Sequence, residues 1–117
     1  MNEGMHWVVD AWGCDAESLR SRERLAAVFD AAVRELRLKP VDAARWHVFP
    51  GEAGVTGFLV LAESHLACHT FPETGFAAFD LYCCRPRDEW AWEARLREHL
   101  GARRVEVRCV SRGKANR

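Results

Sequence analysis

Three apolar runs with short connections between them constrain the fold of this chain most strongly. Residues 57–62 are almost wholly apolar, and two further strand-like runs cover residues 66–71 and 76–83. The first run is typical of a strand buried on both faces. Pro72-Glu73-Thr74-Gly75 separates the other two, and this spacing predicts a β-hairpin. The centre of the chain therefore predicts hairpin-linked strands.

The outer segments add three more strands. Residues 5–12 alternate, with Trp7, Val9 and Ala11 on one face. Residues 44–49 predict a second strand after Pro40, and residues 103–110 alternate again. Six strands in all are expected, and the hairpin links imply a largely antiparallel sheet.

Two amphipathic segments predict helices. In the first, apolar residues recur at spacings of three and four: Leu25, Phe29, Ala32, Val33 and Leu36. Asp15 is a candidate cap for this helix. Pro86-Arg87-Asp88 opens the second, which has a stripe of Trp92, Leu96, His99 and Leu100 and ends at Gly101. The expected fold is α+β, a two-layer sandwich with two helices on one face of the sheet, in one domain of residues 1–117.

Charge and composition exclude several classes of partner and location. Seventeen basic and seventeen acidic side chains cancel, so we expect no nucleic acid and no acidic membrane surface as partner. The first residues lack a signal-peptide pattern, and no apolar run approaches the roughly 18–20 residues of a membrane span. Five cysteines without a CxxC pair indicate a reducing, cytoplasmic location.

Polar groups interrupt the central strands at a few positions. Ser64 lies between Glu63 and His65, and four more candidates follow, namely Cys68, His69, Cys83 and Cys84. In a strand, His65 and His69 share a face and Cys68 points to the other, while Cys83 and Cys84 oppose each other.

Three interpretations of these groups stay open. In the first, these groups are buried structural residues. In the second, His65, His69 and a cysteine bind zinc, although their spacing is not the usual one for zinc ligands. In the third, they form the site of a Ser/His or Cys/His hydrolase. The hydrolase would need an acid to orient its histidine, for which the candidates are Glu63, Glu73 and Asp80.

Several short motifs in order carry a resemblance to a known family. They are Gly54-Val55-Thr56-Gly57, Glu63-Ser64-His65, His69-Thr70-Phe71-Pro72-Glu73 and Cys84, with His6, Asp10, Gly13-Cys14 and Arg112-Gly113 also fitting. Over almost its entire length the chain resembles the bacterial S-adenosylmethionine decarboxylases. These are pyruvoyl-dependent enzymes of polyamine (spermidine) synthesis that convert S-adenosylmethionine to its decarboxylated form.

The resemblance implies a proenzyme, or zymogen, that cleaves itself. Ser64 would attack the carbonyl of Glu63 to form an ester. Elimination would then cut the chain between residues 63 and 64, leaving fragments 1–63 and 64–117. Ser64 would become the pyruvoyl cofactor at the start of the second fragment. His69 and Thr56 match the positions that assist this autocatalytic cleavage, so the processing set is Glu63, Ser64, Thr56 and His69.

The same resemblance assigns roles in turnover. The pyruvoyl carbonyl would form a Schiff base with the substrate amine and accept electrons as carbon dioxide leaves. The implied catalytic residues are Ser64, His69 and Cys84, with the Cys84 thiol as the acid that protonates the α-carbon. Glu73 matches a position that contacts substrate. We expect Cys83 to serve packing and His65 to serve local structure, and we expect no metal ligand among the site residues.

A few positions depart from the family pattern. Arg85 replaces a usual glycine, Thr74 replaces an aromatic residue or histidine, Phe76 replaces a tyrosine, and one extra residue precedes Gly54. We expect these changes on the substrate side of the site, which leaves two alternatives. One is a homologue that decarboxylates arginine or ornithine, and the other is an unprocessed, non-catalytic binding homologue.

Helices on one face of a sheet leave its other face to be covered. We therefore expect a homodimer that packs through this face, with the sites near the interface.

Overall fold

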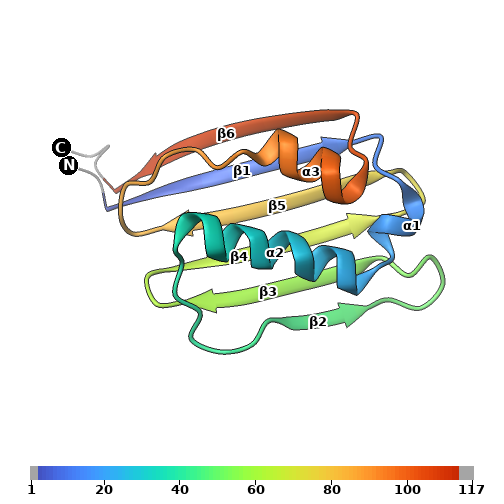
Figure 1. The fold of residues 1–117 in the computed structure, drawn as a ribbon, viewed down its shortest axis with the longest axis horizontal. Helices are drawn as coiled ribbons and strands as arrows, with labels where there is room; N and C mark the ends of the chain where they lie inside the picture. Colours follow the sequence, from blue (N-terminus) through green and yellow to red (C-terminus); the bar gives the residue numbers. More distant parts are fainter. Residues whose placement is uncertain (1–2, 114–117) are drawn as a thin grey trace.

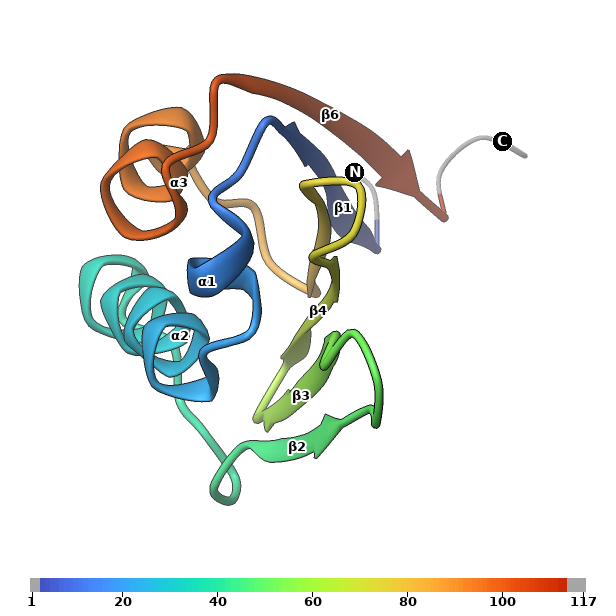
Figure 2. The ribbon, with the colours of Figure 1, turned by 90° about the vertical axis from the view of Figure 1, so that its right-hand side faces the viewer.

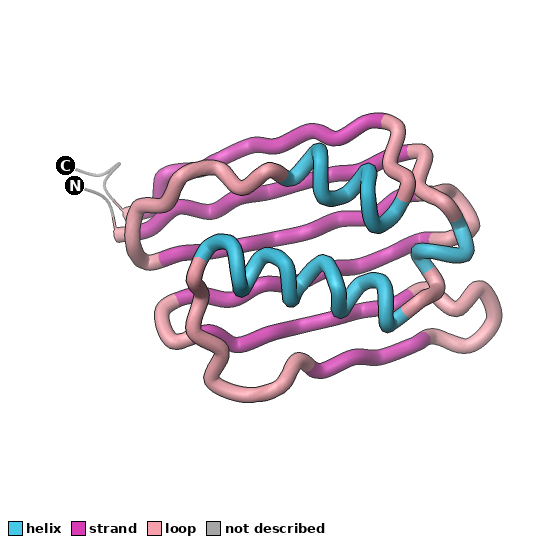
Figure 3. The backbone as a smooth tube through the Cα atoms, viewed as in Figure 1, coloured by secondary structure: helices cyan, strands magenta, loops and turns pink. Residues whose placement is uncertain are grey.

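A computed structural model describes residues 3–113 as one six-stranded sheet with three helices (Figures 1 and 3). The strands follow the order β2-β3-β4-β5-β1-β6, and every neighbouring pair is antiparallel. Their bounds are β1 Gly4–Trp12, β2 Arg45–Val48, β3 Val55–Leu61, β4 Ser64–Phe71, β5 Phe76–Cys83 and β6 Arg104–Arg112. The helices are α1 Ala16–Leu19, α2 Arg22–Leu36 and α3 Trp92–Leu100.

The helices all lie against one face of this sheet, as the side view in Figure 2 shows. Alternate strand residues such as Trp7, Val9 and Leu66 are buried under them. From the helices, Leu25, Phe29 and related apolar residues complete the core. The predicted two-layer α+β sandwich is therefore confirmed, because period-two and period-3.6 apolar patterns meet at a single interface.

The helix boundaries differ from prediction in two places. Asp15 caps the short helix α1, which the sequence pattern missed, by accepting the amide of Ser18. Ser21 then caps the long helix α2 through the amide of Arg24. The second predicted helix begins at Trp92 and not near Pro86, because residues 85–91 form the connection that crosses from β5 to α3. Gly101 ends this helix at a φ of 68°, as expected.

Strand β3 is not buried on both faces, so this prediction was wrong. Its residues alternate, and Phe58 and Val60 are 41% and 47% exposed. No helix among the described residues covers that side of the sheet (Figure 2). We call it the open face. Further large apolar side chains on it, Phe71 and Val110, are also over 40% exposed.

Candidate functional site

Residues 63 and 64 lie in and just after the turn that joins β3 to β4. Ser64 pairs with Leu61 across the hairpin and with Cys83 of β5. Its side chain is half-buried and shares its strand parity with Leu66 of the core, whereas Glu63 and Cys84 are exposed. The peptide N–H of Cys84 donates a 2.9 Å hydrogen bond to the carbonyl oxygen of Glu63. Cys84, twenty positions after Ser64, therefore meets Glu63 and Ser64 at one end of the sheet, which we call the Ser64 end.

The carboxylate of Glu63 is held as well. Arg85 donates to it through Nε, and through Nη2 at 3.0 Å to the second carboxylate oxygen. These hydrogen bonds lower the pKa of Glu63, so the group is ionised at neutral pH. Arg85 was expected on the substrate side of the site. It instead contacts the residue whose carbonyl the resemblance identifies as the point of attack.

The other predicted residues lie toward the opposite end of β4, which we call the His69 end. There Thr56 Oγ1 is 3.2 Å from His69 Nδ1, across the β3–β4 pair. Both residues line a pocket of about 330 Å³ together with Glu73 from the β4–β5 hairpin and Phe49 and Phe71. A hydroxyl, an imidazole and a carboxylate thus share one concave site with two aromatic rings.

Buried backbone contacts hold this end in register. Thr70 is 4% exposed, and its hydroxyl accepts the amide of Val55 at 2.9 Å while donating to the carbonyl of Leu19 at 2.8 Å. Gly54 passes so close that a Cβ there would lie 2.7 Å from the Thr70 carbonyl oxygen. The Gly54 and Thr70 positions of the two motifs therefore build the wall that places Thr56 and His69.

The two ends are too far apart to act together within one chain. Ser64 and His69 are five positions apart on one strand, which separates their α-carbons by about 17 Å at roughly 3.3 Å per residue. The structure brings Glu63, Ser64 and Cys84 together, and separately Thr56, His69 and Glu73. We call these two separate groups of residues the half-sites.

Aromatic rings occupy the open face beside the Ser64 end. His65 stacks between Phe58 and Tyr82, with ring centroids 5.6 and 6.0 Å away. On the next strand His6 Nε2 lies 3.0 Å from Asp80 Oδ1. Partial burial, and next the neighbouring His6, lower the pKa of His65, so its ring is neutral at pH 7. The sequence pattern did not predict this row of rings. The alternation of residues along each strand indicates which side chains share a face, but not which strands are neighbours.

The geometry disfavours the two other interpretations of the histidines. His65 and His69 are about 13 Å apart along one strand, too far to share a metal ion. No cluster of three metal-binding side chains occurs within residues 3–113. The nearest acid to an imidazole is Asp80, but it pairs with His6 and not with a histidine bonded to Ser64. In the described part of the chain, no Ser-His-acid triad forms.

The cysteines divide as their strand parity predicted. All five are free, with Cys83 and Cys68 buried and Cys84 exposed. Burial raises the pKa of Cys68 to about 12 and also raises that of Cys83. The packing role expected for Cys83 agrees with its burial. Across the described residues, no helix is both long and apolar enough to cross a bilayer.

Comparisons with known proteins agree on one family. The family model described as S-adenosylmethionine decarboxylase matches residues 5–113. An S-adenosylmethionine decarboxylase proenzyme of Thermomicrobium roseum is 38% identical over 94% of this chain and 93% of its own length. The proenzyme of Thermococcus gammatolerans is 37% identical over 74% of this chain, but the match spans only 59% of that protein. The crystal structure of the adenosylmethionine decarboxylase from Aquifex aeolicus superposes with a TM-score of 0.81 at 27% identity, covering 96% of this chain and 92% of that one.

Proposed function

Because this chain belongs to the S-adenosylmethionine decarboxylase family, we propose that it is a self-processing carboxy-lyase. It cleaves itself at Glu63-Ser64 and then decarboxylates S-adenosylmethionine in the cytoplasm for polyamine synthesis. The observation that carries this proposal is the hydrogen bond from the Cys84 amide to the Glu63 carbonyl oxygen. An amide aimed at this oxygen stabilises the negative charge that attack by a neighbouring serine creates.

Processing would use the groups at that turn together with His69 and Thr56 from the His69 end. Ser64 Oγ adds to the carbonyl carbon of Glu63, the peptide C–N bond breaks as the ester forms, and the hydroxyl proton passes to the freed nitrogen. Removal of the Ser64 α-proton then breaks the bond between Cβ and the ester oxygen. This step releases the main-chain carboxylate of Glu63 as the new C-terminus and leaves dehydroalanine at position 64. Its imine tautomer takes up water, releases ammonia and becomes pyruvoyl. His69 is suited to accept and return the protons, and the Thr56 hydroxyl 3.2 Å away orients its ring.

The residues around Ser64 also fit the pyruvoyl group that this chemistry would create. Once formed, the group supplies an electrophilic carbonyl that binds the substrate amine and accepts the electrons released with carbon dioxide. Cys84, exposed and joined through its amide to Glu63, is suited to deliver the proton that replaces the lost carboxylate. Glu73, in the pocket with two aromatic rings, is suited to accept hydrogen bonds from ribose hydroxyls.

A homodimer resolves the separation of the two half-sites. Consider two open faces packed together about a two-fold axis that runs perpendicular to the strands. This axis lays β4 of one protomer across β4 of the other with its ends reversed. The Ser64 end of each protomer then meets the His69 end of its partner, so the two half-sites of different chains lie beside each other at each end of the dimer. Phe58, Val60 and Val110, all over 40% exposed, supply apolar surface for this contact.

Two measurements test the proposal. Intact mass of the purified protein should show fragments 1–63 and 64–117, the second blocked by pyruvoyl, and a single uncut chain would contradict the processing step. Carbon dioxide release should then be measured with S-adenosylmethionine, arginine and ornithine. We expect release only from S-adenosylmethionine, and release only from a basic amino acid would contradict the substrate.

A further inference from the structure

Two consecutive residues hold Glu63 from both sides of its α-carbon. The amide of Cys84 binds its carbonyl oxygen at 2.9 Å, and the guanidinium of Arg85 grips its carboxylate through Nε and Nη2. A two-point grip by a planar guanidinium fixes direction as well as distance. Together the contacts restrict rotation of the residue that contributes the bond to be cut.

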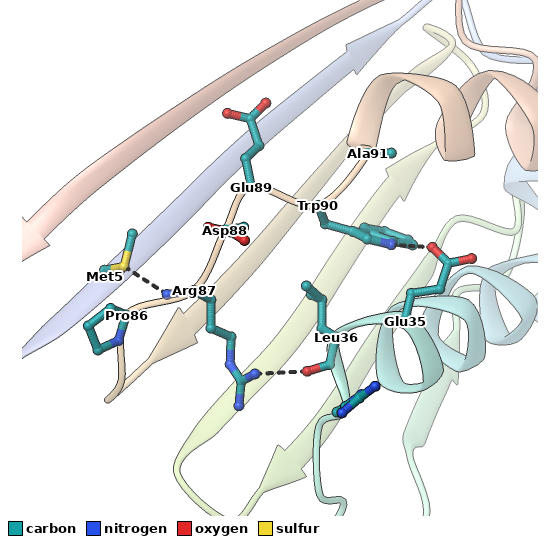
Figure 4. A pocket seen from close by; sticks show the side chains of 10 residues that line it. Met5, Glu35, Leu36, Pro86, Arg87, Asp88, Glu89, Trp90 and Ala91 are labelled. Carbon is teal, nitrogen blue, oxygen red and sulfur yellow. Dashed lines mark hydrogen bonds between the residues drawn. The ribbon is translucent and has the colours of Figure 1, made fainter.

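The segment that carries these donors is anchored in turn. Arg87 donates from Nη1 to the carbonyl of Leu36 at the end of α2, at 2.8 Å, and its amide lies 3.3 Å from Met5 Sδ. Figure 4 shows this side chain reaching from the connection after β5 to the helix. Through Arg87, the segment that holds Glu63 is therefore anchored to β1 and to the end of α2.

The Arg85–Glu63 pair is poorly placed to stabilise the whole fold. The Arg85 side chain is 70% exposed and that of Glu63 is 45% exposed. Exposed ion pairs of this kind contribute little to global stability because water screens them. Its effect is local, on the orientation of one residue in a turn.

We propose that Arg85 is a positioning residue for self-cleavage, one that holds Glu63 with its carbonyl oxygen on the Cys84 amide so that Ser64 Oγ meets the carbonyl carbon. This inference rests on the proposed processing function. Arg85 takes no part in bond making or breaking. Its contribution is to raise the fraction of precursor molecules in the reactive conformation.

A double-mutant cycle on freshly synthesised precursor tests the role. Precursors of the wild type, Arg85→Ala, Glu63→Gln and the double variant are made by cell-free translation, and fragment formation is followed by mass spectrometry. We expect each single variant to cleave about two- to fivefold more slowly, and the double variant no more slowly than either, because both remove the same contact. Arg85→Lys keeps the positive charge but cannot donate to both carboxylate oxygens in the same planar geometry. It should therefore cleave at a rate between those of Arg85→Ala and the wild type.

A matched control separates positioning from loss of a surface ion pair. Arg97 grips Glu93 on α3 through Nε and Nη2, far from the turn in sequence and similarly exposed. Arg97→Ala should cleave at the wild-type rate. High salt should slow the wild type toward the rate of Arg85→Ala while leaving that variant unchanged, and melting temperatures should stay equal.

Three results would overturn the inference. Arg85→Ala could cleave at the wild-type rate, the effects of Arg85→Ala and Glu63→Gln could multiply, or Arg85→Ala could melt earlier in proportion to its slower cleavage. In each case the wild type is still cut, so the proposed function survives. A wild-type precursor that is never cut would instead overturn both.

Discussion

The two ends of β4 differ in what they hold and in how they are built. At the Ser64 end, an exposed turn presents a peptide bond whose carbonyl oxygen accepts the amide of Cys84. At the His69 end, a pocket of about 330 Å³ presents Thr56, His69 and Glu73. Within residues 3–113, the first end holds the bond that the proposed function cuts, with no proton-transfer base in hydrogen-bond contact, and the second end holds such a base without that bond. The difference teaches that, under the proposed function, β4 supplies both halves of a site only if two copies of the chain meet.

Mixing two inactive variants tests this pairing most severely. Ser64→Ala should abolish cleavage, and His69→Ala should slow it by about 10²-fold or more, the usual contribution of a positioned base. Refolded together, the two chains should form mixed dimers in which Ser64 of the His69→Ala chain meets an intact His69. Mass spectrometry should then find fragments only from the His69→Ala chain.

Each variant refolded alone is the control for this experiment. If His69 acted within its own chain, the mixture would cleave no faster than His69→Ala alone, and the two-half arrangement would be wrong.

A charge introduced on the open face should dissociate the proposed dimer into protomers. Val60→Lys places a cation at a side chain that is 47% exposed in one protomer, and symmetry places it in the interface twice. Burying unpaired charge costs several kcal/mol, so we expect dimer affinity to fall by about 10²-fold or more. Sedimentation should show monomers, and cleavage should become dependent on concentration.

The matched control places the same charge on the other layer. Ala94→Lys lies at an exposed position of α3 and should leave both the dimer and cleavage unchanged. A Val60→Lys protein that stayed dimeric would move the interface to a different surface.

Within the His69 end, removing one hydroxyl should have a moderate effect. Thr56→Ala deletes the partner of His69 Nδ1, and losing one hydrogen bond corresponds to about a two- to tenfold slower cleavage. Thr56→Ser keeps the hydroxyl and should cleave at close to the wild-type rate. Equal rates for Thr56→Ala and the wild type would show that the ring of His69 is oriented by other contacts.

The smallest expected effect is on the pH dependence of stability, through His65 in the row of rings beside the Ser64 end. The pKa of His65 is lowered below its usual value of 6.5 by burial and by His6, so the folded state disfavours the imidazolium. As pH falls through 6.5 the unfolded chain takes up this proton first, and the free energy of unfolding should decrease until the folded pKa is reached. In thermal melts between pH 7 and 5, the wild type should lose more stability than His65→Gln as the pH falls. A constant difference would exclude His65 as the source.

Much of the fold was readable from sequence because local periods report which side chains face the helices. Trp7, Val9 and Ala11 alternate into the core as expected. The error at Phe58 and Val60 has a physical cause. An apolar side chain looks the same whether a helix of its own chain or the surface of another copy is meant to cover it. Periodicity therefore shows that an apolar side chain is to be buried, but not which surface buries it.

The site was less readable than the fold. Motif resemblance singled out Ser64, His69 and Cys84, but their grouping depends on strand register, which pairs Ser64 with Cys83 and Thr56 with His69. Register is a long-range property that no short pattern encodes. The contact of Arg85 with Glu63 was missed for the same reason, since it joins residues from two different turns.

If the chain is cleaved as proposed, the order of the strands has a consequence for the product. Fragment 1–63 carries β1, β2 and β3, and fragment 64–117 carries β4, β5 and β6, yet the order in the sheet is β2-β3-β4-β5-β1-β6. Strand β1 of the first fragment is inserted between β5 and β6 of the second. Strands of the two fragments would therefore remain hydrogen-bonded to each other within one sheet. The proposed cut would create a new chain end without releasing a subunit, because separating the fragments would require three strand pairs to open, β3–β4, β5–β1 and β1–β6.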